Sequence, residues 1–106
     1  MNLEDVVEES MKIREAYHVL EEKYHGRRWT LQEDALAMST DVGLINRLVM
    51  DKAQIWPYKQ DDTDQLEYKI GEVIWWLAVI ANESDIDLNH AAEQFISKKQ
   101  SDFNIK

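Results

Sequence analysis

The scarcity of helix-breaking residues is the strongest constraint on this chain. Its 106 residues include only three glycines and one proline. An all-β chain needs a turn signal about every 8 to 12 residues, so the sequence predicts an all-α fold. The absence of cysteine excludes disulfide frameworks, thiolate zinc sites and cysteine nucleophiles. A chain of this length can bury about 65% of its unfolded surface in one core, so we expect residues 1–106 to form a single domain.

Apolar residues recur at steps of three and four in four segments, which predicts helices at about 3–25, 31–54, 64–82 and 88–100. We expect the first helix to end at Gly26 and the second to begin with a capping box of Thr30 and Glu33. The second must end before Pro57, and Asp87 is placed to cap the fourth. The polar residues 58–63 are expected to form the one long loop. Together the segments predict a four-helix bundle.

Each of these helices has a distinct apolar pattern, and the fourth is expected to bury Leu88, Ala91, Ala92, Phe95 and Ile96. The first is amphipathic, with Leu3, Val6, Val7, Ile13, Tyr17, Leu20 and Tyr24 at helical spacing. The second is expected to bury Leu31, Ala35, Leu36, Met38, Val42, Ile45, Leu48, Val49 and Ala53. The third is apolar on nearly all sides after Gly71, which is too much apolar surface for a lone domain of this size. We therefore expect a homodimer or homotetramer in which the second and third helices pair with their symmetry mates.

The charge of the chain limits its partners. A formal charge of −9 disfavours nucleic acid and anionic lipid, and no apolar run approaches the ~20 residues of a membrane span. The N-terminus is acidic where a signal peptide is basic, which indicates a cytoplasmic protein. One small basic patch contains His25, Arg27 and Arg28, followed by Trp29. The patch either grasps a phosphate group beside a base-stacking Trp29, or forms a solvated turn at the end of the first helix.

Two carboxylates lie beside glycines in the interiors of the second and third helices. Asp41 lies close to Gly43, and Glu72 follows Gly71. A glycine in a helix interior costs about 1 kcal/mol relative to alanine, which favours close packing of one helix on the other at these points. If the helices cross at their glycines, the two carboxylates meet, and facing helices of a bundle are where carboxylates hold Mg²⁺.

These segments resemble MazG-type proteins of the all-α NTP pyrophosphohydrolase superfamily. The resemblance lies in the order of helices, the segments 41–43 and 70–77, and the turn 86–88 into a final helix containing Lys98. It covers about residues 30 to 103. It implies a four-helix bundle that hydrolyses a (d)NTP to a (d)NMP and pyrophosphate with Mg²⁺ held by carboxylates of two helices.

The resemblance implies particular site residues. The first metal motif of the family falls on Thr40, Asp41 and Leu44, and the second on Lys69 and Glu72. Asp41 and Glu72 keep a carboxylate and are the implied Mg²⁺ ligands, whereas Leu44 and Lys69 depart from the motif. Lys98 matches a lysine that faces phosphate, but Ile96, Ser101 and Asp102 replace the polar residues near it. Lys69, Lys98, Arg27, Arg28 and Trp29 are the candidate substrate-binding residues.

The departures leave alternatives open. Lys69 can pair with Asp41 and Glu72 and replace the metal with a fixed cation, giving a catalytically silent relative that binds a nucleotide or a protein. Asp41 and Glu72 can instead recruit Glu67 or Asp34 to rebuild a cation site. A plain helical oligomerisation module is the third reading. Trp75 and Trp76 are expected to be core or interface anchors rather than base-stacking residues, and His18 and His90 to lie at the surface.

Overall fold

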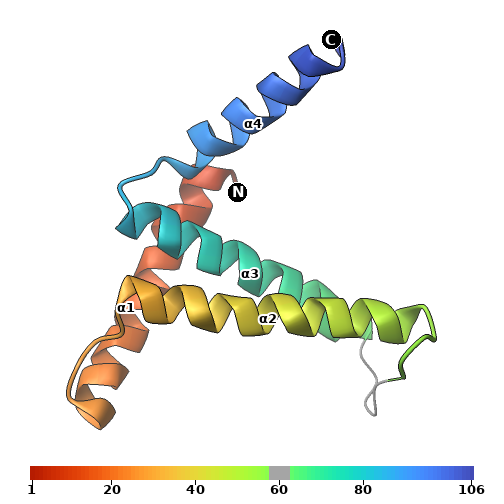
Figure 1. Cartoon of the computed structure of the whole chain (residues 1–106). Helices are drawn as coiled ribbons and strands as arrows, with labels where there is room; N and C mark the ends of the chain where they lie inside the picture. Colours follow the sequence, from red (N-terminus) through yellow and green to blue (C-terminus); the bar gives the residue numbers. More distant parts are fainter. Residues whose placement is uncertain (58–62) are drawn as a thin grey trace.

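The computed structural model describes residues 1–57 and 63–106, in which four α-helices pack as a bundle (Figure 1). They are α1 (Leu3–His25), α2 (Leu31–Lys52), α3 (Thr63–Glu83) and α4 (Leu88–Asp102). The predicted all-α class and four-helix architecture are confirmed, and the helix bounds lie close to those expected. The predicted long loop falls mainly on residues 58–62, outside the described residues.

The ends of the helices follow the predicted local chemistry. Gly26 ends α1 in the left-handed conformation at a φ of 78°, where the lack of a Cβ avoids strain. Thr30 and Glu33 form the predicted capping box of α2, and the Asp87 side chain accepts from the His90 N–H at the start of α4. A further capping box at Asn2 and Asp5 begins α1.

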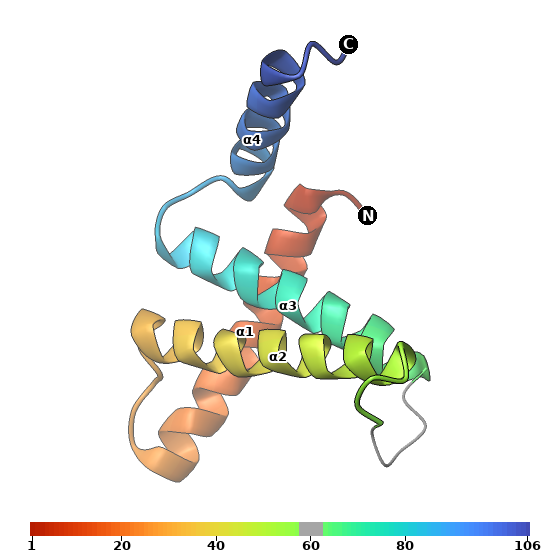
Figure 2. The same ribbon diagram turned by 45° about the vertical axis from the view of Figure 1, so that its right-hand side comes forward.

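The two central helices, α2 and α3, run side by side in opposite directions, and α1 crosses them (Figures 1 and 2). Helix α4 contacts α1 and α3 where it begins and then points away from them, so that the C-terminus lies at the tip of an arm. Every residue from Glu93 to Lys106 is exposed, so the prediction that Phe95 and Ile96 face inward is wrong, because the arm leaves the other helices before it reaches them.

The apolar core is small and comes from the central pair of helices. The buried hydrophobic residues of the described chain are Leu48, Trp76, Ala78, Val79 and Ala81. The prediction that α2 buries Leu36, Val42 and Val49 is wrong, because all three are exposed in this chain.

Helix α1 is turned with a polar face toward the core. Its buried residues are Ser10, Arg14 and His18, so the prediction that His18 lies at the surface is wrong, whereas His90 is exposed as expected. The apolar residues of α1 at successive turns, Ile13, Tyr17, Leu20 and Tyr24, face outward. Ion pairing explains the inversion, since α2 and α3 present carboxylates to α1 at this point.

The prediction that α2 and α3 cross at their glycines is also wrong. A Cβ added to Gly43 or to Gly71 meets no atom within 4 Å, so both glycines face open space. The two helices approach instead through larger side chains, among them Asp41 and Trp76. None of the helices in the described residues is long and apolar enough to cross a membrane.

Candidate functional site

The helices bring together Lys69, Asp41 and Glu72, the three charged residues of the sequence-predicted metal site. Lys69 Nζ lies 2.7 Å from Glu72 Oε1 on the next turn of α3 and 3.2 Å from Asp41 Oδ1 on α2. The second Asp41 oxygen, Oδ2, accepts from the Trp76 indole N–H at 2.8 Å. We call these four residues the Lys69 cluster.

The Lys69 cluster is half-buried, and its two carboxylates favour the charged form of Lys69. The side chains of Lys69 and Asp41 keep 24% and 14% of their exposure. The hydrogen bond to Glu72 raises the pKa of Lys69 above its usual value; burial opposes this, and the hydrogen bond to Asp41 adds to it. One ammonium between two carboxylates leaves a net charge of −1 at the position where the predicted site would hold a divalent cation.

The residues of this cluster do not fit a Mg²⁺ ion. Mg²⁺ needs near-octahedral oxygen ligands at about 2.0–2.1 Å, and it gives up its own water reluctantly. Here one oxygen of each carboxylate binds the Lys69 ammonium, and the other Asp41 oxygen binds Trp76. The neighbouring family position, Leu44, offers no oxygen. Within residues 1–57 and 63–106, no group of three or more His, Asp or Glu is placed to hold a metal.

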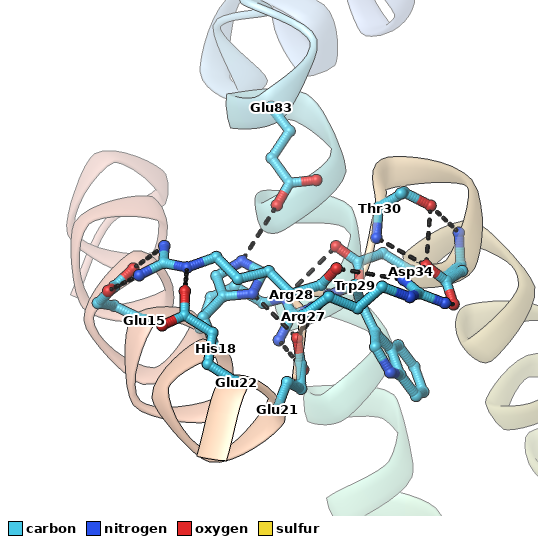
Figure 3. Close-up of polar contacts among 12 residues, drawn as sticks. Glu15, His18, Glu21, Glu22, Arg27, Arg28, Trp29, Thr30, Asp34 and Glu83 are labelled. Carbon is cyan, nitrogen blue, oxygen red and sulfur yellow. Dashed lines mark hydrogen bonds and ion pairs between the residues drawn. The ribbon is translucent and has the colours of Figure 1, made fainter. Parts of the chain in front are cut away.

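The basic patch is taken up by ion pairs at the turn between α1 and α2 (Figure 3). Arg27 pairs with Glu33 at 2.7 and 2.9 Å, and Arg28 pairs with Glu15 at 2.8 Å and also with Glu22. The hydrogen bonds from Arg27, followed by that from the Thr30 N–H, lower the pKa of Glu33 to about 2. This arrangement is the solvated-turn alternative, with each guanidinium already neutralised.

The remaining predicted residues lie apart from the Lys69 cluster. The backbone N–H of Trp29 donates to Glu21 at 2.8 Å, and its side chain borders a shallow hollow on α2. Lys98 lies on the exposed part of α4 and pairs with Asp102 one turn later. The structure therefore does not bring Trp29 or Lys98 to the Lys69 cluster. Trp75 packs edge-on against Trp76, and its indole N–H donates to the Ser10 carbonyl at 3.1 Å, in agreement with a packing role.

A second cluster, which the sequence did not reveal, lies at the crossing of α1, α2 and α3. Arg14 and Asp34 are 1% and 0% exposed, and Arg14 Nη2 lies 2.7 Å from Asp34 Oδ1. Arg14 Nε also donates to Asp34 Oδ2 at 3.3 Å, and Nη1 donates to Glu21 at 2.8 Å. His18 Nδ1 lies 3.0 Å from Glu21, and Glu83 of α3 approaches the other ring nitrogen (Figure 3). We call this the Arg14 cluster.

The pKa values of Arg14, Glu21 and Glu83 in the Arg14 cluster are shifted by different balances of burial and partners. For both Arg14 and Glu21, burial is the largest single effect and disfavours the charged form. The hydrogen bonds of Arg14 to Glu21 and Asp34 outweigh burial and raise the pKa of Arg14. The hydrogen bonds of Glu21, among them those from Arg14 and the Trp29 N–H, outweigh burial and lower the pKa of Glu21. For Glu83 the balance is reversed, because burial and Asp34 outweigh the opposing charges of Arg14 and His18. Burial, and then the neighbouring Asp34 charge, raises the pKa of Glu83 above its usual value.

The sequence contained one signal for this cluster. Arg14 and His18 are four residues apart and interrupt the apolar pattern of the first helix, while Asp34 lies one turn into the second. Charged residues are rarely fully buried unless they are paired, so a helix face with an arginine and a histidine predicts partners only if that face is known to point inward. The exposed apolar stripe on the same helix made the opposite orientation the natural expectation.

Comparison of the chain with family models, with curated proteins and with solved structures finds no match. The architecture that is established is an all-α protein of four helices. The MazG resemblance thus rests on the residues already quoted, and what it implies for function is a proposal.

Proposed function

We propose that this chain is a catalytically silent MazG-like module that acts through protein interaction, with Lys69 in the place of the cation. The observation that carries the proposal is the position of the Lys69 ammonium, 2.7 Å from Glu72 and 3.2 Å from Asp41. A second cation at this point would lie beside the first. The charge that Mg²⁺ would supply to a bridge between α2 and α3 is supplied by the protein itself.

The same cluster disfavours a nucleotide as the ligand. A triphosphate is recognised by cations with free hydrogen-bond donors, usually arginine, lysine or Mg²⁺. Lys69, Arg27 and Arg28 each lie against carboxylates, and the Lys69 cluster has a net negative charge. The exposed apolar surface of α1, α3 and α4 supports protein interaction instead, because large apolar patches on a small domain mark interaction sites. The expected homodimer or homotetramer belongs to this proposal.

The alternative, a Mg²⁺-dependent (d)NTP pyrophosphohydrolase, makes the opposite prediction in one assay. We expect no pyrophosphate from ribo- and deoxyribonucleoside triphosphates with Mg²⁺ or Mn²⁺, and no heat of Mg²⁺ or nucleotide binding in calorimetry. Turnover that disappears in both Asp41→Ala and Glu72→Ala would overturn the proposal and establish a hydrolase. Metal-independent nucleotide binding that disappears in Lys69→Met would show that the module binds a nucleotide and would overturn the proposed protein interaction.

Restoring the motif tests the family register. The double variant Leu44→Glu/Lys69→Glu removes the ammonium and supplies two carboxylates next to Asp41 and Glu72, so we expect it to gain Mg²⁺ binding in calorimetry. Leu36→Glu/Lys12→Glu is the matched control, because it makes the same two substitutions at exposed positions outside the cluster. If both double variants fold and neither binds Mg²⁺, the register of the resemblance is wrong.

A further inference from the structure

The chain exposes far more surface than a compact monomer of its size. Its accessible surface is 8073 Å² at 12.5 kDa, whereas the size relation for monomers gives about 6,200 Å². The radius of gyration is 16.6 Å, against about 13 Å for a compact domain of this length. The excess of roughly 1,900 Å² per chain lies in the range that each partner contributes to a large, obligate dimer interface.

Part of this surface is a groove between α1 and α3. Ile13 and Tyr17 form one wall, Tyr68 and Trp75 the other, and Gly71 and Glu72 complete a cavity of about 330 Å³. The rings of Tyr17 and Trp75 contact each other with centroids 5.8 Å apart. Along α1 the apolar lining continues outward through Leu20 and Tyr24, both exposed.

The glycine in this groove indicates a close neighbour from outside the chain. A Cβ at position 71 would meet no atom of its own chain within 4 Å. No contact within the chain therefore explains why a helix interior keeps a residue that costs about 1 kcal/mol relative to alanine. An element that lies directly on the backbone of α3 would explain it, and such an element would also cover the aromatic walls.

The arm formed by α4 is an element with a matching unpartnered face. Phe95 and Ile96 of α4 are 65% and 53% exposed, and Phe103, the C-cap residue, is 70% exposed, so the arm presents apolar side chains that the rest of the described chain leaves uncovered. The arm also differs in charge from the rest of the chain. Residues 93–106 contain three lysines against two acids, whereas the whole chain has 12 basic against 21 acidic residues.

We propose that the α4 arm of a second copy of this chain lies in the groove between α1 and α3, with Phe95 against the aromatic walls. This inference rests on the interaction role proposed above and names its partner. A two-fold dimer makes each contact twice, so one arrangement covers both grooves and both arms. An amphipathic helix in an apolar groove is a common recognition mode, and the arm, with three lysines against two acids, is opposite in net charge to the rest of the chain.

The arm of the same chain does not reach this groove in the structure. It leaves the C-terminal end of α3 and points away from the other three helices (Figures 1 and 2). The joint is held by hydrogen bonds from the Ile86 N–H to the Ala81 carbonyl and from the His90 N–H to Asp87. Folding back onto its own groove would require the arm to reverse its direction at this joint.

Disulfide trapping tests the contact directly, because the native chain has no cysteine. We expect Tyr68→Cys/Phe95→Cys to form a covalent dimer on mild oxidation, seen by non-reducing electrophoresis. The matched control, Tyr68→Cys/Gln94→Cys, places the second thiol on the neighbouring position of the arm and is expected to stay uncrosslinked. A disulfide within one chain, or equal crosslinking of the control, overturns the proposal.

A second measurement needs no new bond. We expect the wild-type chain to be a dimer by light scattering and Phe95→Glu to weaken the dimer at least tenfold, while Gln94→Glu does not. Phe95 is exposed in the chain itself, so circular dichroism should show unchanged helix content in both variants. A monomeric wild type, or a dimer indifferent to Phe95→Glu, overturns the proposal. Neither readout depends on Mg²⁺ or pyrophosphate. A negative result for the α4 contact can therefore be told apart from a negative result in the metal and nucleotide assays of the Lys69 cluster.

Discussion

Helix α2 supports two ion-pair clusters of similar composition, and they differ in depth. Asp34 and Asp41 lie seven residues apart on α2, so they share one face of the helix, and each accepts from a cation on a neighbouring helix. Asp34 and its arginine are fully buried, whereas Asp41 and its lysine keep contact with water. The buried pair joins α1 to α2, whereas the half-buried pair joins α3 to α2.

The difference in burial predicts which ion-pair cluster contributes more to the stability of the fold. Removing one partner of a buried ion pair leaves an uncompensated charge in a low-dielectric interior, whereas water can solvate the partner left behind at a half-exposed site. We therefore expect the fold to tolerate the loss of a single partner less well in the Arg14 cluster than in the Lys69 cluster. The Lys69 cluster can vary without loss of the fold, and for that reason it is the better place to look for a change of function.

The largest expected effect comes from Asp34→Ala. We expect it to lower the free energy of unfolding by about 3–5 kcal/mol, because Arg14 stays buried without its main partner. For Asp41→Ala we expect about 1–2 kcal/mol, since Lys69 keeps Glu72 and some water. Urea unfolding at one fixed protein concentration measures both.

The double variant Arg14→Met/Asp34→Leu is the control for this comparison. It removes both charges and fills the space with apolar groups, so its stability should lie close to that of the wild type. Equal losses for Asp34→Ala and Asp41→Ala would show that burial does not separate the two clusters.

A smaller effect is expected from pH, through Glu83 in the Arg14 cluster. Burial and the Asp34 charge raise the pKa of Glu83. The stability contributed by the proton on Glu83 is therefore fully present below the ordinary pKa of 4.5, and it is lost as pH rises through the raised pKa. We expect wild-type stability to fall over this rise in pH. Glu83→Gln stays neutral and should remove the fall.

The acidic side of the same titration has the opposite sign. The pKa of Glu21 is lowered by its hydrogen bonds, and that of Glu33 to about 2, so their contributions are present above 4.5 and lost as pH falls through the lowered values. These losses should persist in Glu83→Gln. Denaturant unfolding from about pH 3 to about pH 8 separates the loss of stability at acidic pH from the loss that Glu83 causes as pH rises. A fall at rising pH that survives in Glu83→Gln would assign it to another group.

Local features of this chain were predictable from the sequence because they depend on neighbouring residues. The cap at Gly26, the box of Thr30 and Glu33 and the end of α2 before Pro57 each involve contacts within a few positions. The approach of Asp41 to Lys69 also followed from spacing, once the helices were expected to face each other. The chemistry of short segments sufficed for these.

The orientation of α1 was not predictable in the same way. The stripe from Ile13 to Tyr24 indicates an apolar face but not which molecule covers it, and in this chain the opposite face is buried through Arg14 and His18. The spacing of apolar residues shows which face of a helix is apolar, but it does not show whether the same chain or another molecule covers that face. The glycines misled for the same reason, because a small residue marks a close approach without identifying the element that approaches.

The smallest expected effect comes from Gly43→Ala, two residues from Asp41 on α2. The added Cβ meets nothing within 4 Å, so the gain in helix propensity should raise the free energy of unfolding by about 0.5–1 kcal/mol in the same urea experiment. Both clusters should remain intact, and the Asp41→Ala loss should be unchanged in this background. A loss of stability instead would mean that another chain packs on α2 at Gly43, as expected if α2 pairs with its symmetry mate.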